Sequence, residues 1–189
     1  MNERSIYIVL SQTNTLPSRL IRFYTREPYA HASLAMDEEL NEMYSFARKG
    51  IYNPLNSGFV QEDIDGGVFG RCKSARCCVF ELKVTSEQYQ LIRDELAVFK
   101  RNQDLYSYNF LGILGVIFHI PIRTEFTYFC SQFVATILER SHVEILDRNC
   151  ALVRPVDFRL NPHLTRIYTG PLADYRLIRK AQKNPLPSV

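Results

Sequence analysis

The chain contains several short apolar runs with the composition of β-strands. Residues 5–10, 30–36, 40–48 and 78–84 are rich in β-branched or alternating apolar side chains, and 165–169 is a further short run of this kind. These patterns predict strands. An acidic turn at 37–39 separates the second run from the third, so we expect these two strands to form a hairpin.

Other segments repeat their apolar positions every three to four residues. This spacing predicts amphipathic helices at 86–102 and 128–140, a helix or helix pair at 106–118, and a helix near Pro17 with Leu16, Leu20 and Phe23 on one side. Residues 49–75 are rich in Gly, Asn, Pro and Asp, and we interpret them as a long irregular excursion. Strands and helices mix without steady alternation, which favours an α+β fold over a doubly wound sheet.

The composition fits one globular domain. A chain of 189 residues with 46% apolar and 12% aromatic side chains can bury a sizeable core. We expect a single domain over residues 1–179 and a frayed tail at 180–189. The net charge of +3 supplies no general field for nucleic acid or for an anionic membrane, so we expect no nucleic-acid partner.

The apolar runs are too short for export or for crossing a membrane. Residues 6–10 form too short an apolar stretch for a signal peptide. Residues 110–122 are interrupted by glycines, His119 and Pro121 and are shorter than the roughly 20 residues of a membrane helix. We therefore expect a cytoplasmic protein without a transmembrane segment.

The cysteines predict neither a disulfide framework nor a metal site. Their number is five, which is odd. Cys72, Cys77 and Cys78 lie close together, but no second pair completes a tetrahedral set of ligands. We expect no metal and no organic cofactor.

Cys130 and His31 are the candidate catalytic residues. Cys130 lies where an amphipathic helix begins, and the dipole and free N–H groups of a helix N-terminus favour a thiolate. His31 begins a strand among small residues, and a neutral imidazole is the usual base for a thiol nucleophile. Taken separately, each also fits a structural role, as a buried cysteine or as a hydrogen-bonded strand histidine.

In their order along the chain, these two motifs resemble a known family. The segment Tyr-Ala-His-Ala-Ser at 29–33 precedes Tyr-Phe-Cys-Ser-Gln-Phe-Val at 128–134, and Arg-Pro-Val-Asp-Phe follows at 154–158. This order resembles the circularly permuted branch of the NlpC-type papain-like superfamily, the YiiX-like proteins, with lecithin retinol acyltransferase as a more distant relative. The resemblance implies a small antiparallel sheet or half-barrel packed against the helix that carries Cys130, and a Cys130–His31 dyad.

The resemblance also implies a third, polar residue that orients the imidazole from the strand after His31. Its spacing falls nearest Ser45, with Glu42 as the reserve, although alternation places Glu42 on the opposite face. The implied activity is that of a thiol hydrolase, an amidase or peptidase, or of an acyltransferase, working through an acyl-enzyme on a peptide-like amide or an acyl-lipid. The alternative is a catalytically idle binding module that keeps the pocket for such a ligand.

Overall fold

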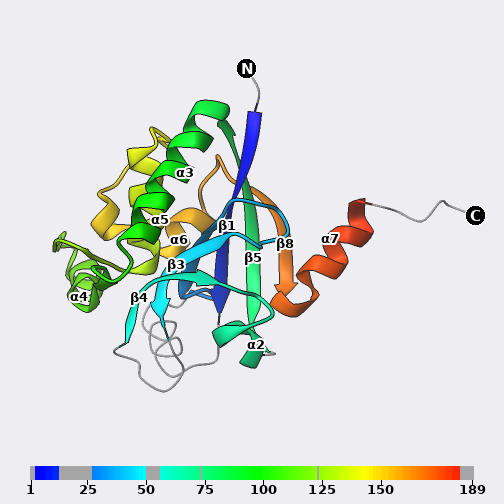
Figure 1. Cartoon of the computed structure of the whole chain (residues 1–189), viewed down its shortest axis with the longest axis horizontal. Coiled ribbons are helices and arrows are strands. Elements are labelled where there is room, and N and C mark those ends of the chain that lie inside the picture. The colour runs from blue at the N-terminus through cyan, green and yellow to red at the C-terminus, as the bar shows by residue number, and fades with distance from the viewer. Residues whose placement is uncertain (1–2, 13–26, 50–55, 73, 123, 184–189) are drawn as a thin grey trace, which may run out of the picture.

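A six-stranded antiparallel sheet forms the centre of the molecule (Figure 1). The computed structural model describes residues 3–12, 27–49, 56–72, 74–122 and 124–183. The strand order is β4-β3-β2-β1-β5-β8, and the strands are β1 (Glu3–Gln12), β2 (His31–Ala35), β3 (Met43–Arg48), β4 (Ser57–Glu62), β5 (Arg76–Thr85) and β8 (Thr165–Pro171). A separate parallel pair joins β6 (Ser107–Tyr108) to β7 (Thr127–Tyr128). The predicted α+β class is confirmed.

The register of the central strands fixes which side chains share a face. β1 pairs with β5 along its whole length, from Glu3 opposite Thr85 to Gln12 opposite Arg76. Because strand side chains alternate, Ile8 and its β2 partner Leu34 enter one core cluster while Val9 enters the other. The β1–β2 ladder ends with Ser11 opposite His31. His31 therefore lies at one end of the sheet.

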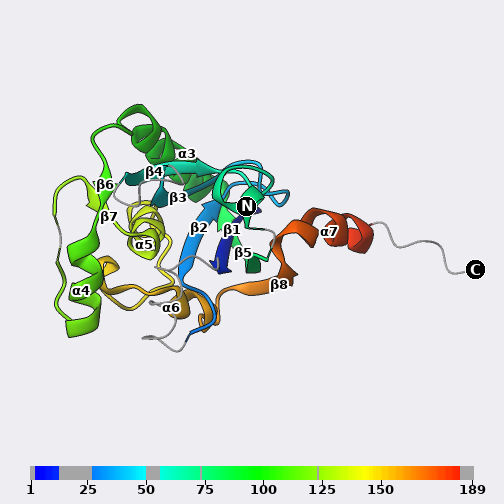
Figure 2. The same ribbon diagram turned by 90° about the horizontal axis from the view of Figure 1, so that it is seen from below.

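Two amphipathic helices cover one face of the sheet (Figure 2). They are α3 (Ser86–Arg101) and α5 (Cys130–Arg140), and α5 packs on β2 and β3. α3 begins with a reciprocal cap, in which the Thr85 hydroxyl accepts from the Gln88 N–H and the Gln88 side chain accepts from the Thr85 N–H. The shorter helices are α2 (Gly67–Arg71), α4 (Phe110–Phe118) and α6 (Pro155–Arg159).

Aromatic rings fill the core between this face and the two helices. Phe46 of β3 lies at the centre of this core. The ring centroids of five aromatic residues lie 5.2 to 6.1 Å from that of Phe46, and these residues are Phe59, Phe99, Tyr106, Tyr128 and Phe133. We call these six residues the aromatic cluster. Most of the ring pairs are tilted or edge-on, the arrangement that aromatic quadrupoles favour. The cluster therefore joins β3, β4, α3, α5 and the β6–β7 pair.

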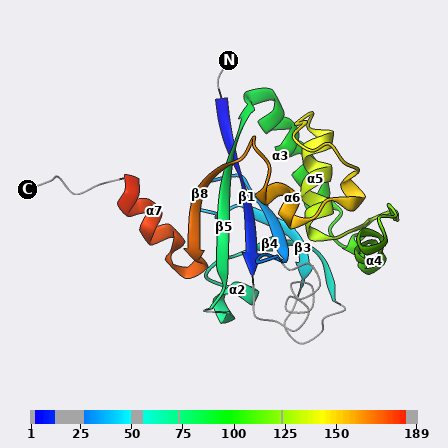
Figure 3. The same ribbon diagram turned by 180° about the vertical axis from the view of Figure 1, so that it is seen from behind.

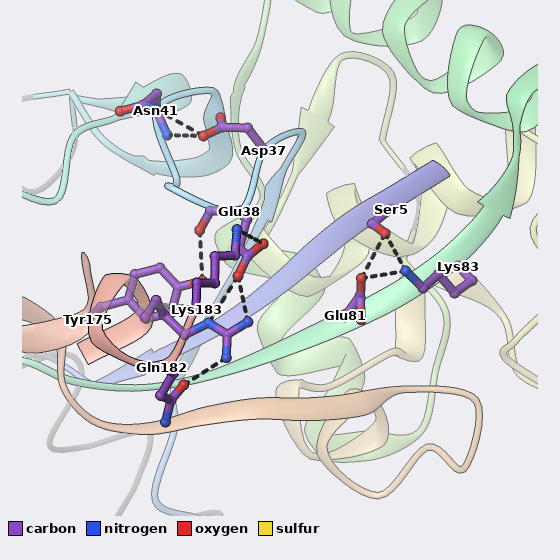
Figure 4. A network of polar contacts seen from close by, with 10 residues as sticks. Ser5, Asp37, Glu38, Asn41, Glu81, Lys83, Tyr175, Gln182 and Lys183 are labelled. Atoms are coloured by element: carbon purple, nitrogen blue, oxygen red, sulfur yellow. Dashed lines mark hydrogen bonds and ion pairs between the residues drawn. The ribbon is translucent and has the colours of Figure 1, made fainter. Parts of the chain in front are cut away.

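The C-terminal helix α7 (Tyr175–Lys183) follows β8 on the side of the molecule away from α5 (Figure 3). Tyr175 donates from its hydroxyl to the main-chain oxygen of Glu38 at 2.7 Å. The Glu38 carboxylate accepts from Arg179 at 2.5 Å and pairs with Lys183 at 2.6 Å (Figure 4). We call Glu38, Tyr175, Arg179 and Lys183 the Glu38 network. It holds the turn between β2 and β3 against α7.

Several elements differ from the sequence prediction. The excursion predicted over 49–75 contains β4 and α2, and residues 107–108 form a strand before α4 begins. The tail predicted to fray from residue 180 continues α7 to Lys183, because Lys183 is paired with Glu38. The helix predicted near Pro17 lies outside the described residues. Among the helices that the structure describes, none is both long and apolar enough to cross a membrane.

Candidate active site

Cys130 is the first residue of α5, and polar contacts fix the start of that helix. The Gln132 side-chain oxygen accepts from the Phe129 N–H and from the Asn109 amide, both at 3.3 Å. The Asn109 N–H in turn donates to the Tyr128 carbonyl at 3.0 Å. These bonds tie the first turn of α5 to the β6–β7 pair, so the position of Cys130 is defined by two chain segments.

His31 and Glu62 form an ion pair on the sheet. The Nε2 atom of His31 lies 2.9 Å from Oε1 of Glu62, the last residue of β4. The second carboxylate oxygen accepts from the Ser33 hydroxyl. The Glu62 side chain is 9% exposed and that of His31 is 21% exposed. A buried carboxylate needs such partners to remain charged.

Helix α5, which begins at Cys130, packs on β2, which begins at His31, and the two side chains lie close enough for each to act on the pKa of the other. Burial raises the pKa of Cys130, but the His31 imidazole and the main-chain groups of Ala32 and Ser131 outweigh it and lower this pKa below its ordinary value. The site therefore favours a thiolate.

The pKa values of His31 and Glu62 are shifted as well. Burial lowers the pKa of His31, but the Glu62 charge and the contacts with Cys130 outweigh it and raise this pKa well above its ordinary value. Burial raises the pKa of Glu62, but His31 and the Ser33 and Ser45 hydroxyls outweigh it and lower this pKa. Together these shifts favour a thiolate–imidazolium pair that is backed by a carboxylate.

The partner of His31 is Glu62, which corrects the prediction of Ser45 or Glu42. The Ser45 hydroxyl is buried and makes no hydrogen bond within the described part of the chain, although it lies close enough to favour the charged form of Glu62. Glu42 precedes β3 and pairs with Arg93 at 3.3 Å. Both predictions placed the partner in or next to β3, the strand after that of His31, whereas the partner lies in the following strand, β4.

Tyr108 is a second residue at the site that the sequence analysis missed. Burial, together with the nearby charge of Cys130, raises the pKa of Tyr108 well above its ordinary value. The only sequence signal for Tyr108 was its place just before an apolar run. The signal for Glu62 was a carboxylate that ends a short β-prone segment, Ser-Gly-Phe-Val-Gln-Glu.

Neither the cysteines nor the acidic residues indicate a metal site. The five cysteines are free thiols, and Cys77 and Cys78 enter different core clusters. Within the described ranges, no group of three or more His, Cys, Asp or Glu side chains is arranged to hold a metal ion.

Comparisons with known proteins give no relative: no protein-family model, no curated protein and no solved structure matches the chain.

Proposed function

We propose that this protein is a thiol hydrolase or acyltransferase with a permuted papain-like arrangement, in which Cys130 is the nucleophile, His31 the base and Glu62 the residue that orients the base. The observation that carries the proposal is the ion pair of His31 with Glu62 at 2.9 Å, beside a Cys130 whose pKa the His31 imidazole lowers. A nucleophile, a base and an orienting group in this order form the general arrangement of covalent acyl-transfer enzymes.

The reaction would proceed through an acyl-enzyme. The Cys130 thiolate attacks the carbonyl carbon of the substrate, a C–S bond forms, and the carbonyl π electrons move to oxygen. When this oxyanion collapses, the C–N or C–O bond breaks and the leaving group takes the proton from the His31 imidazolium. Water or another acceptor, deprotonated by His31, then attacks the thioester and releases the acyl group and the thiolate.

The surroundings of the site support a substrate with an apolar acyl portion. Tyr108 packs against Phe110, with ring centroids 4.9 Å apart. From Phe110 onward, α4 and the segment after it expose large apolar side chains that we call the apolar α4 face: Phe110, Leu111, Leu114, Phe118, Ile120 and Phe126. Large exposed apolar patches mark interaction sites and ligand-binding grooves. This face favours an acyl-lipid or acyl-amide over a polar peptide.

Glu62 weakens the case for a catalytically idle module. A serine as the third residue would favour such a module, because a serine offers no charge to an imidazolium. A carboxylate supplies the charge-assisted hydrogen bond that is roughly twice as strong as a neutral one.

The test is selective alkylation. At neutral pH, iodoacetamide should modify Cys130 before Cys77, since burial raises the pKa of Cys77 to about 12. His31→Ala should slow the modification of Cys130, whereas the matched change of an exposed histidine, His163→Ala, should not. Mass spectrometry of the digested protein gives the rate at each cysteine, and equal rates at all five would contradict the proposal.

A further inference from the structure

Asn109 is a buried residue whose side chain joins three chain segments next to Cys130. Its side-chain oxygen caps α4 by accepting from the Gly112 N–H at 2.7 Å. Its side-chain amide donates to the Ile122 carbonyl and to the Gln132 side-chain oxygen, both at 3.3 Å. Asn109 is only 3% exposed, so these hydrogen bonds are shielded from water.

The two bonds of the amide tie the segment that carries most of the apolar α4 face to the start of α5. Asn109 precedes this segment, Ile122 ends it, and Gln132 lies two residues after Cys130. α4 lies at the outer side of the molecule (Figure 2) and packs mainly on the short helix η1 (Cys150–Leu152). Few contacts therefore fix the distance from the apolar α4 face to the sulfur, and the bonds of Asn109 are among them.

Gly112 leaves the space that the Asn109 side chain occupies. A Cβ atom at position 112 would lie 2.7 Å from the Asn109 Cγ atom, closer than such atoms come in proteins. A side chain at this position would push the Asn109 amide away from Ile122 and Gln132. The tie between α4 and α5 thus depends on a glycine as well as on the asparagine.

We propose that Asn109 is a positioning residue: it holds the apolar α4 face at a fixed distance from Cys130, so that an acyl chain bound on that face presents its carbonyl carbon to the sulfur. Binding energy from a remote part of a substrate raises the rate of the chemical step when it orients the reacting atoms. This inference rests on the proposed function and adds to it how the acyl chain is used.

Asn109→Ser separates the tie from the cap. Serine caps a helix about as well as asparagine, so α4 keeps its cap. The main-chain N–H of residue 109 can still donate to the Tyr128 carbonyl, and Gln132 can still accept from the Phe129 N–H. The serine side chain is too short to reach Ile122 and Gln132, so the variant loses the tie while the start of α5 keeps its own contacts.

The measurement is single-turnover acylation of Cys130 by p-nitrophenyl acetate and by p-nitrophenyl hexanoate, followed through the release of p-nitrophenolate. We expect Asn109→Ser to lower the limiting rate of acylation by the hexanoate about tenfold or more, because its carbonyl is no longer held at the sulfur. The hexanoate concentration that gives half this rate should change less than about twofold, since the face itself remains. Acylation by the acetate and alkylation by iodoacetamide should also change less than about twofold, because neither reagent has a chain to position.

Two further variants accompany this measurement. Gly112→Ala should reproduce the loss for the hexanoate, because its methyl group displaces the Asn109 side chain. Asn102→Ser is the matched control: the Asn102 amide donates to the Val98 carbonyl at the end of α3, and its loss should leave every rate within about twofold. Circular dichroism at the assay temperature shows whether each variant is folded.

The outcomes distinguish the two proposals. Equal slowing of both esters in Asn109→Ser, or no slowing of either, would overturn the positioning role while the thiol chemistry of the wild-type protein stands. A wild-type protein that the hexanoate acylates no faster than the acetate would do the same. A wild-type protein that neither ester acylates at Cys130 would overturn the proposed function, and the role of Asn109 with it.

Discussion

Glu62 shows how a single buried carboxylate can set the protonation of a whole site. Its two oxygens serve different partners, His31 and Ser33, and its side chain is only 9% exposed. Such a group is costly to bury unless its charge is matched, and His31 supplies the match. The charge on His31 in turn favours the thiolate of Cys130. A change at Glu62 should therefore alter the pKa of Cys130 through its effect on His31.

We expect Glu62→Gln to shift the alkylation of Cys130 to higher pH. Without the carboxylate the pKa of His31 falls, the imidazolium is less populated, and the pKa of Cys130 rises. The measurement is the rate of iodoacetamide modification between pH 5 and about pH 9. Glu42→Gln is the matched control, since Glu42 pairs with Arg93 and not with His31. If the Glu42 variant shifted the profile and the Glu62 variant did not, the assignment of Glu62 would be wrong.

The site residues that could be predicted from the sequence are those that belong to local motifs. Cys130 and His31 each stand in a short segment whose pattern predicts its own helix or strand, and the structure brings them together. Glu62 depends on the pairing of β4 with β3, which places it beside a histidine 31 positions earlier in the chain. No local pattern encodes that pairing, so the partner of the base could not be read from its neighbours in the sequence.

α4 is the element whose environment differs most from its composition. The run from Phe110 to Phe118 is apolar enough for a core helix, yet within it only Gly112 and Gly115 are buried. A side chain at Gly115 would meet the main-chain oxygen of Ile120 at 2.5 Å, so a close approach of the chain to itself requires glycine here. The spacing of apolar residues predicts the helix. It does not predict whether the helix is buried, because burial depends on which other elements pack against it.

The apolar α4 face should make longer acyl chains better substrates. Each methylene buried against it contributes about 0.8 kcal/mol, so kcat/KM for p-nitrophenyl esters should rise up to about fourfold per added methylene from acetate to hexanoate. Phe118→Ser should reduce this gain, because Phe118 is 69% exposed on that face.

The control for this prediction is Leu177→Ser. Leu177 is 74% exposed on α7, away from α4 (Figure 2), and its loss should leave the dependence on chain length unchanged. Ester hydrolysis measured below the micellar concentration of each ester gives both slopes. A flat dependence in the wild-type protein would argue for a polar substrate instead.

At the scale of the whole molecule, α7 stabilises the turn that joins the strand of the base to the next strand. The Glu38 carboxylate accepts from Arg179 and Lys183, and these contacts lower the pKa of Glu38 in spite of its partial burial, which raises it. Arg176 extends the attachment by donating to the main-chain oxygen of Glu39 at 2.8 Å. The C-terminal segment thus belongs to the fold as far as Lys183.

We expect Glu38→Gln to lower the free energy of unfolding by about 1 to 2 kcal/mol at pH 7. Because the pKa of Glu38 is lower in the folded state than its ordinary value of 4.5, its contribution is present above that value. The contribution is lost as the pH falls through the folded pKa. The difference between variant and wild type should therefore shrink on acidification below about pH 4.5.

Urea unfolding at several pH values measures this difference, and Glu39→Gln is the control, because Glu39 meets α7 through its main-chain oxygen. A difference that stayed constant down to pH 3 would show that the carboxylate charge does not stabilise the fold.

The aromatic cluster has a consequence for how the protein can be observed. The chain contains no tryptophan, so its near-ultraviolet circular dichroism comes from tyrosine and phenylalanine rings held in fixed positions. Five of these rings surround Phe46, where the sheet, α3, α5 and the β6–β7 pair come together. This optical signal follows the docking of the Cys130 helix onto the sheet, whereas the far-ultraviolet signal follows the helices and strands themselves.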